Sequence, residues 1–411
     1  MNNNSKRKPN VTNITNTIIT LVLLLILIVV TVYLVLNRTN ETESTNTTIV
    51  SNHKSEPYSP IEAKLLTDEV SVDTMPQENV MTVFDESNYT INESYYKYLN
   101  PQDINGQYVY MINQTTKEIV YQKGADTKCY PASTTKILTA VVALENISPD
   151  TVFTVGTELS LVPAGSSLAY IQQGEKITLN DLLYGLMLPS GNDVAYTIAV
   201  NVAKRVSGKS MTDEEAIKYF ATLMNETAQK IGMKDSHFVV PDGFHDANHY
   251  VTAKDMMKLL VYSQNFELIK KIASTYTYEC KVASGQNYTW VNSNRLLDPN
   301  GTFYYAGVNG LKTGFHDDAG HCVAITSNIN GMELYIVIMK ADSYILRNYD
   351  TINLLNMIVN PSAIKIGNQW YETTNPDDTT VTTAPIVTDT NGSVVSTVPQ
   401  GTNSNGNAIG F

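Results

Sequence analysis

Cysteine and tryptophan are scarce in this sequence, and strongly basic segments are lacking. The 411 residues include two tryptophans and three cysteines, Cys129, Cys280 and Cys322. An odd number of cysteines without Cys-x-x-Cys spacing predicts neither a disulfide framework nor a cysteine-based zinc site. The formal net charge of −12 argues against binding to nucleic acid. These absences exclude a disulfide-rich scaffold, and we predict no nucleic-acid partner.

Long hydrophobic runs are also rare, with one exception near the N-terminus. Residues 18–36 are apolar apart from Thr20, Thr31 and Tyr33. About 19 residues, at about 1.5 Å each, nearly cross a hydrocarbon core of about 30 Å. The run ends without the small residues of a signal-peptide cleavage site, so we predict an uncleaved transmembrane anchor. The basic cluster before it predicts a cytoplasmic N-terminus, residues 1–17, with the remaining chain outside.

The rest of the chain divides by composition into three parts. Residues 37–99 are rich in Asn, Thr, Ser and Glu without a sustained period, which predicts a disordered extracytoplasmic linker. Residues 371–411 are rich in Thr, Asn, Pro and Gly, and we predict a disordered tail there. Residues 100–370 lie between them. The chain is 43% hydrophobic, and we predict one globular domain over this range.

Hydrophobic periodicity within that domain predicts both strands and helices. Strands are expected at 108–112, 119–121, 322–326 and 334–339, the last two joined by a turn at Asn330-Gly331. Helices are expected at 181–188, 193–206, 214–232, 253–263 and 347–359. A further helix follows Pro131 and ends at Asn146. It is apolar nearly all round, so we expect it inside the core.

Ser133 and Lys136 are the obvious reactive side chains at the start of that central helix. Residues three apart share a helix face. A helix start also offers unpaired backbone N–H groups to a developing oxyanion. A buried serine beside a lysine predicts a nucleophile with its base. The same spacing occurs at 51–54 in a polar stretch without a helix, so the pair needs further partners.

Two further motifs supply such partners. A Ser-Gly-Asn element lies at 190–192, between two predicted apolar helices, and Lys-Thr-Gly lies at 312–314, ahead of the second hairpin. A second Ser-x-Asn at 263–265 falls at the end of an amphipathic helix, and we set it aside. Ser-x-x-Lys, Ser-x-Asn and Lys-Thr-Gly in this order are the combined signature of penicillin-binding proteins and related β-lactamases.

With these motifs the chain resembles the serine D-alanyl-D-alanine carboxypeptidases among the low-molecular-mass penicillin-binding proteins. The resemblance covers residues 103–357 and includes the stretches at 187–193, 241–243, 249–256, 294–297 and 307–314. It implies an α/β (α+β) fold of the DD-peptidase/β-lactamase type. In that fold an antiparallel sheet is flanked by helices, and the site lies between the sheet edge and an all-helical part. It also implies that the anchor lies in a bacterial cell membrane.

The resemblance further implies the catalytic roles. Ser133 attacks the carbonyl between the two D-alanines of a peptidoglycan stem peptide. Lys136 takes the proton if it is neutral, which burial and a second nearby cation favour. Ser190 passes a proton to the leaving amine. The backbone N–H groups of Ser133 and Phe315 form the oxyanion hole. β-Lactam antibiotics are then expected to acylate Ser133 as covalent inhibitors.

Substrate binding is implied for the remaining motif residues. The family pattern assigns the acyl-side amide to Asn192 and the terminal carboxylate to Lys312 and Thr313, beside Gly314. One departure follows this motif, because many relatives carry a hydroxyl residue where this chain has His316. That difference bears on carboxylate recognition. Many relatives also have a C-terminal β-rich domain and an amphipathic membrane helix, neither of which we identify, and we expect the N-terminal anchor to replace the helix.

Three other functions stay open at this stage. A β-lactamase would share the fold, but no convincing Glu-x-x-x-Asn element follows the second motif, and Ser-Gly-Asn rather than Ser-Asp-Asn favours the peptidase. A zinc D,D-carboxypeptidase could use His245 and His249, although Gly243 disfavours a helix there and no third ligand is obvious. His316 leaves open a pseudoenzyme that binds cell-wall peptides without cleaving them. We predict no metal and no cofactor.

Overall fold

The computed structural model describes residues 81–283 and 285–366, together with two short segments at 387–388 and 394–395. The predicted cytoplasmic residues 1–17 and the predicted anchor lie outside the described residues. Within the described ranges, no helix has the length and apolar character needed to cross a bilayer.

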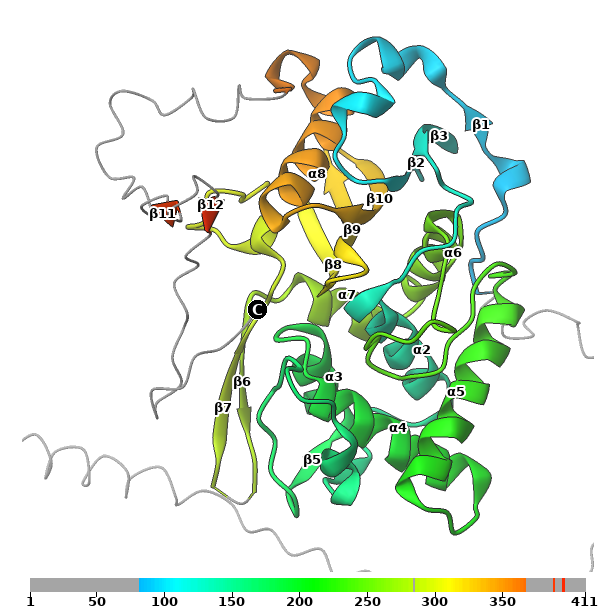
Figure 1. Cartoon of the computed structure of the whole chain (residues 1–411), viewed down its shortest axis with the longest axis vertical. Coiled ribbons are helices and arrows are strands. Elements are labelled where there is room, and N and C mark those ends of the chain that lie inside the picture. Colours follow the sequence, from blue (N-terminus) through cyan, green and yellow to red (C-terminus); the bar gives the residue numbers. More distant parts are fainter. Residues whose placement is uncertain (1–80, 284, 367–386, 389–393, 396–411) are drawn as a thin grey trace, which may run out of the picture. The chain divides into compact units, whose positions relative to one another are not determined.

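A six-stranded sheet forms one half of the domain, in the order β1-β3-β2-β10-β9-β8 (Figure 1). Its strands are β1 (Thr90–Ile91), β2 (Tyr108–Asn113), β3 (Glu118–Lys123), β8 (Val308–His316), β9 (Gly320–Ile329) and β10 (Met332–Ala341). Neighbouring strands pair antiparallel, as predicted, except that β1 joins β3 in parallel. Both predicted hairpins are confirmed, and the turn at Asn330-Gly331 has positive φ at both residues, as such a turn requires. The sheet therefore ends at β8, the strand that carries the Lys-Thr-Gly motif.

Strand β10 shows why the central strands of the sheet are continuous apolar stretches in the sequence. Ile336 and Ile338 face a cluster that includes Leu354 of α8 (Tyr344–Val359). Val337 and Met339, which alternate with them, face the cluster formed with the other helices. Helix α8 packs on β9 and β10, and α6 packs on β2, β9 and β10. Because both faces of the sheet are covered, its central strands are apolar on both sides.

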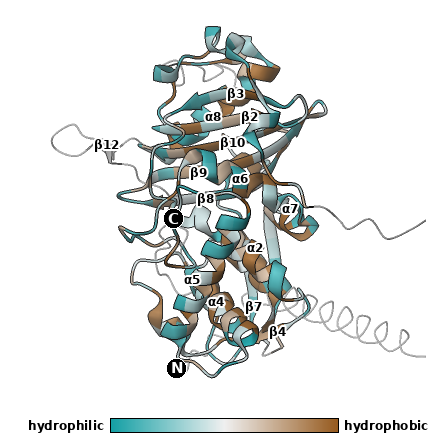
Figure 2. Ribbon diagram, turned by 90° about the vertical axis from the view of Figure 1, so that its right-hand side faces the viewer, coloured by the Kyte–Doolittle hydropathy of each residue, from teal (hydrophilic) through white to brown (hydrophobic). Residues whose placement is uncertain are grey.

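The other half of the domain is mainly helical. Its helices are α2 (Lys136–Asn146), α3 (Leu179–Met187), α4 (Asn192–Ser207), α5 (Asp213–Lys230), α6 (Ala253–Ser263) and α7 (Glu267–Ser274). Short 3-10 helices are η1 (Glu86–Asn88), η2 (Glu93–Lys97), η3 (Pro101–Asp103), η4 (Ala132–Thr135), η5 (Thr157–Leu161), η6 (Arg295–Leu297) and η7 (Pro361–Ala363). Figure 2 shows α2 as one of the more hydrophobic segments, and its first eight residues are all buried, as expected for the central helix. The helices predicted at 181–188, 193–206, 214–232, 253–263 and 347–359 lie within three residues of these bounds. The central helix α2 begins later than predicted, and α7 was not predicted.

Side-chain caps explain where several of these helices begin. Thr178, Thr252 and Ser343 each accept a hydrogen bond from the third residue of the helix that follows. Thr212 and Glu215 form a capping box at the start of α5. The predicted starts at 181 and 347 came from hydrophobic periodicity and fall two and three residues inside the capped starts of α3 and α8.

The prediction of an all-helical part was wrong in one respect. Two ribbons accompany the helices: β4 (Val152–Thr154) pairs with β5 (Lys176–Thr178), and β6 (Thr277–Lys281) pairs with β7 (Asn287–Val291). In the first ribbon, Phe153 and Ile177 are register partners, and both are buried between more exposed neighbours. This alternation over only three residues is too short to stand out in the sequence.

The predicted linker over 37–99 was also wrong at its C-terminal end. Phe84 and Leu99 are buried, and β1 lies along the edge of the sheet. The Phe84 ring lies 4.8 Å from the ring of Tyr89 and 6.3 Å from that of Tyr110 in β2. A few aromatic side chains thus hold a polar segment against the domain, although its composition resembles that of a disordered chain. Within the predicted tail, β11 (Val387–Thr388) pairs with β12 (Val394–Val395).

Candidate active site

Ser133 lies in a tight turn that leads into the central helix. The sequence predicted a helix from just after Pro131, but its first turn is the 3-10 helix η4, and α2 begins at Lys136. Ala132 has φ +46°, a backbone conformation that a side chain disfavours. The hydroxyl and N–H of Thr134 both donate to the Pro131 carbonyl, at 2.6 and 3.2 Å. The turn therefore holds Ser133 and Lys136 in one fixed relation.

The Lys136 amine is the centre of the site. Its Nζ donates to Ser133 Oγ at 2.8 Å, to Asn192 Oδ1 at 2.7 Å and to the Asp242 carbonyl at 2.9 Å. These three acceptors match the three N–H donors of an ammonium group. Burial lowers the pKa of Lys136 to about 8, although the carboxyl groups of Asp242 and Asp193 raise it. A neutral amine is therefore accessible near neutral pH, at hydrogen-bond distance from a serine hydroxyl.

The second motif lies at the bend between α3 and α4. Ser190 has φ +65°, and its buried Oγ has no hydrogen-bond partner among the described residues. Asn192, the first residue of α4, accepts from Lys136 and donates through Nδ2 to Ser166 Oγ at 2.9 Å. The carboxylate of Asp193 accepts from the Ala169 N–H at 2.9 Å, which anchors the loop that carries Ser166. Ser190 thus presents an uncommitted hydroxyl at the bend.

The third motif lies on the edge strand β8. Lys312 is buried, and its Nζ donates to the Thr313 carbonyl at 3.0 Å. Burial, followed by repulsion from Lys136 and Arg347, lowers the pKa of Lys312 well below its usual value. The Thr313 hydroxyl shares a hydrogen bond of 2.7 Å with the Ser293 hydroxyl. The two lysines are therefore close enough to repel each other, but the pKa of Lys136 is lowered by burial and not by Lys312.

Gly314 allows β8 to approach the nucleophile turn closely. A Cβ at this position would lie 2.9 Å from the Ser133 backbone nitrogen and 3.0 Å from the Pro131 carbonyl oxygen. The next residue, Phe315, is about half exposed, and its side chain stacks on His321 at 4.3 Å between ring centroids. The structure therefore brings all three motifs together. The oxyanion hole formed by the N–H groups of Ser133 and Phe315 stays a prediction.

Three residues at the site were not predicted from the sequence: Asp242, Ser166 and Ser293. Asp242 is buried, accepts from Lys136 through its carbonyl and from the Phe244 N–H through Oδ1 at 3.1 Å, and burial raises the pKa of its carboxyl group. Gly243 has φ +83°, and a Cβ there would lie 1.8 Å from the Ala132 carbonyl oxygen. The Pro-Asp-Gly sequence at 241–243 was the available indication, because it marks a tight turn.

The histidine pair that we considered for zinc does not form. His249 is buried, with Nε2 at 2.8 Å from Thr135 Oγ1 and Nδ1 accepting from the Val239 N–H at 3.1 Å. Burial lowers the pKa of His249 to about 3, so it is neutral. Both ring nitrogens are engaged within the fold, which excludes a zinc site made by His245 and His249. His316 lies near His245 instead, with 5.2 Å between ring centroids.

Comparison with known proteins agrees with this geometry. The model of the D-alanyl-D-alanine carboxypeptidase family matches residues 96–343. The D-alanyl-D-alanine carboxypeptidase of Streptomyces sp. strain K15 is 30% identical over 256 residues, covering 60% of this chain and 84% of that protein. The carboxypeptidase DacF of Bacillus subtilis is 28% identical over 249 residues, covering 60% of each protein.

Solved structures show the same fold. The crystal structure of the Streptomyces K15 DD-transpeptidase matches with a TM-score of 0.57 and 30% identity, over 62% of this chain and 97% of that one. DacD of Francisella tularensis matches with a TM-score of 0.54 and 25% identity, over 62% and 71%. The mixed α/β fold and the family resemblance are thereby confirmed. Because the family model matches more than half of its length, the chain belongs to the serine-type D-alanyl-D-alanine carboxypeptidases.

Proposed function

We propose that this protein removes the terminal D-alanine from peptidoglycan stem peptides through an acyl-enzyme on Ser133. The observation that carries the proposal is the 2.8 Å hydrogen bond between the buried Lys136 Nζ and the partly buried Ser133 Oγ. A serine hydroxyl is a weak nucleophile unless a neighbouring base accepts its proton. Family membership supports the same chemistry.

In the acylation step, the neutral amine of Lys136 accepts the Ser133 proton while Oγ bonds to the substrate carbonyl carbon. The N–H groups of Ser133 and Phe315 donate to the oxyanion that forms. As the C–N bond breaks, Ser190 Oγ passes its proton to the nitrogen of the departing D-alanine, and the Lys136 ammonium returns to Ser190 the proton that it took from Ser133. Its hydroxyl is suited to this step because no described residue binds it. Water attacks the ester in the second half-reaction, and Ser133 recovers its proton.

Substrate binding is assigned to the residues around this pair. Lys312 is buried, and it forms no ion pair with a carboxylate of the described residues. A buried cation without a counter-charge is costly, and the terminal carboxylate of a peptide would supply that charge. Thr313 adds a hydroxyl donor, Gly314 allows close approach, and Asn192 binds the acyl-side amide. A β-lactam would use the same contacts and remain on Ser133.

A second outcome for the acyl-enzyme is transfer to an amine. The observation that favours it is the relative from Streptomyces K15, which is named a DD-transpeptidase. Both reactions share the acylation step and differ in whether water or an amine attacks the ester. The roles proposed above for acylation therefore apply to both reactions.

One experiment tests these assignments together. Fluorescent penicillin should label the full chain but not the Ser133→Ala variant. D-alanine release from a D-Ala-D-Ala peptide is then measured with and without added glycine as acceptor. Release without acceptor supports the carboxypeptidase, and release that depends on glycine supports the transpeptidase. Labelling without any release would support the peptide-binding pseudoenzyme, and rapid turnover of penicillin would support a β-lactamase.

We also propose that residues 18–36 tether the catalytic domain to the outer face of a bacterial cell membrane. The apolar run and the basic residues before it support this orientation. The chain should sediment with membranes after a salt wash, and deletion of residues 1–36 should release it. Recovery of the full chain in the salt-washed supernatant would refute the anchor.

A further inference from the structure

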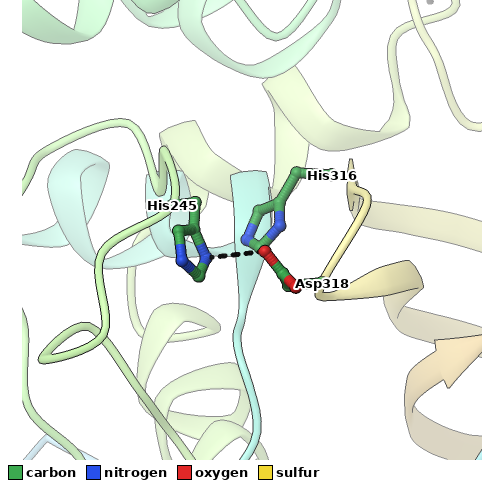
Figure 3. A group of neighbouring side chains, drawn as sticks. All are labelled: His245, His316 and Asp318. Carbon is green, nitrogen blue, oxygen red and sulfur yellow. Dashed lines mark ion pairs between the residues drawn. The ribbon is translucent and has the colours of Figure 1, made fainter.

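Three side chains from two distant segments of the chain converge beside the nucleophile turn. One ligand atom from each of His245, His316 and Asp318 lies within 4.8 Å of those from the other two. His245 Nδ1 and Asp318 Oδ2 are 3.4 Å apart. Figure 3 shows the two imidazole rings and the carboxylate directed toward one another. His245 lies in the loop after Asp242, His316 is the last residue of β8, and Asp318 lies in the turn that follows β8. The proposed peptidase reaction uses none of the three.

These ligand types suit a particular class of ion. Two imidazoles and one carboxylate are a common donor set for Zn²⁺, with metal–ligand distances of about 2.0–2.2 Å. Neighbouring ligands of a tetrahedral ion at such distances are about 3.4 Å apart. The His245–Asp318 distance of 3.4 Å already matches this value. His245 and Asp318 are 40% and 61% exposed, so an ion has access from solvent.

We propose that His245, His316 and Asp318 bind a divalent transition-metal ion of the Zn²⁺ class. The ion would have three protein ligands and a fourth position open to water. This proposal departs from our prediction from sequence, which included no metal. It also differs from a zinc peptidase, because the reaction remains that of Ser133 and the ion lies outside the serine–lysine pair.

The position of the ligands indicates what the ion would do. His245 follows Asp242 by three residues, and the Asp242 carbonyl accepts a hydrogen bond from Lys136. His316 follows Gly314 by two residues, and Gly314 lies against the Ser133 backbone. A metal ion would fasten the loop that holds the base to the strand that borders the nucleophile. Its expected role is to stabilise the site as a cross-link between these segments.

Two local contacts bear on binding at His316. The Ala319 N–H donates to His316 Nδ1 at 3.2 Å. An imidazole that binds metal through Nε2 carries its proton on Nδ1, so this hydrogen bond would be given up. The Tyr130 ring lies 4.9 Å from the His245 ring and 5.9 Å from the His316 ring, which restricts the motion of both imidazoles. The Ala319 hydrogen bond lowers the affinity for metal, because binding breaks it. The packing against Tyr130 favours binding, because the two imidazoles lose less conformational freedom when the ion binds.

Zinc binding by the full chain tests the proposal. The metal-stripped protein is titrated with ZnCl₂ by calorimetry, and bound zinc is counted by elemental analysis after dialysis. His316→Ala and Asp318→Asn are the test variants. Exposed His237→Ala and Asp317→Asn are the matched controls, because they remove the same groups outside the cluster. We expect the test variants to lose one equivalent of zinc, with affinity at least tenfold weaker, and the controls to keep it.

Thermal unfolding provides an independent measurement. Zn²⁺ should raise the Tm of the wild-type chain and of both controls, and leave the two test variants unchanged. Equal zinc binding by all five proteins, or no binding to the wild type at a large excess of Zn²⁺, would overturn the proposal. Penicillin labelling of each protein reports separately that the serine site is folded. Failure of labelling in the wild type would count against the peptidase and not against the metal site.

Discussion

Gly314 of β8 lies directly against Ser133: a Cβ atom on Gly314 would be 2.9 Å from the Ser133 backbone nitrogen. The contact joins the edge of the sheet to the start of the central helix. It therefore sets how closely the edge strand approaches Ser133. A substitution at this position should act on the reaction rather than on folding alone.

The variant Gly314→Ala should slow acylation by penicillin. Its Cβ would push β8 away from the turn, and a displacement of about 1 Å in a reacting group costs about 100-fold in rate. Stopped-flow or gel-based labelling gives the acylation rate constant. Gly331→Ala is the control, since Gly331 has φ +81° with nothing near its Cβ position, and it should lower the Tm without changing labelling. Unchanged labelling in Gly314→Ala would contradict this account.

The acylation rate should increase with pH and level off at high pH, with its midpoint near the pKa of Lys136, about 8. Only the neutral amine accepts the Ser133 proton, and below the pKa its fraction falls about tenfold per pH unit. Lys136→Met should lower the rate by about 10²–10⁴-fold and abolish this pH dependence. The exposed Lys209→Met should keep the wild-type profile. A wild-type rate that falls between about pH 6 and pH 8 would show that the protonated amine is the active form.

Asp242→Asn should move that midpoint to lower pH. The Asp242 carboxyl group raises the pKa of Lys136, and burial lowers it. Without the charge of Asp242, the pKa of Lys136 should therefore fall further. The amide is close in size to the carboxylate, and the carbonyl that accepts from Lys136 is retained. The pH profile of penicillin acylation measures the shift, with the exposed Asp235→Asn as control. An unchanged midpoint would mean that the carboxyl group is neutral in the native site, and a shift to higher pH would contradict this account.

The contact between Ser133 and Lys136 was predictable because it is local. Ser133 and Lys136 are three residues apart, and a single helical turn brings them together whatever the rest of the fold does. The other partners of Lys136 are not local: Asn192 is 56 residues away and Asp242 is 106. Asn192 was found because it belongs to a recognisable motif. Asp242 acts through its carbonyl, which any residue possesses, so its side chain could not identify it.

Composition also gave a wrong prediction where a few apolar contacts fix a segment that consists mostly of polar residues. Phe84 and the strand β1 hold a polar segment against the sheet. The many Asn, Ser and Glu residues around them made the segment resemble a disordered chain. His245 and His316 illustrate the same limit for a site. They are 71 residues apart in the sequence, and only the packing of the loop against the end of β8 brings them together. Local spacing instead suggested His249, whose nitrogens are occupied within the core.

Ser190→Ala should separate activity from stability. The Ser190 hydroxyl is buried and makes no hydrogen bond to a described residue, so its removal should leave the Tm unchanged or raise it. Transfer of a proton to the leaving group typically contributes about 10²–10⁴-fold, and D-alanine release should fall accordingly. Ser263→Ala is the matched control, because its hydroxyl donates to the Leu260 carbonyl at 2.7 Å. That variant should lose stability and keep the rate. If Ser190→Ala instead lowers the Tm and retains the rate, Ser190 holds the bend between α3 and α4 and transfers no proton.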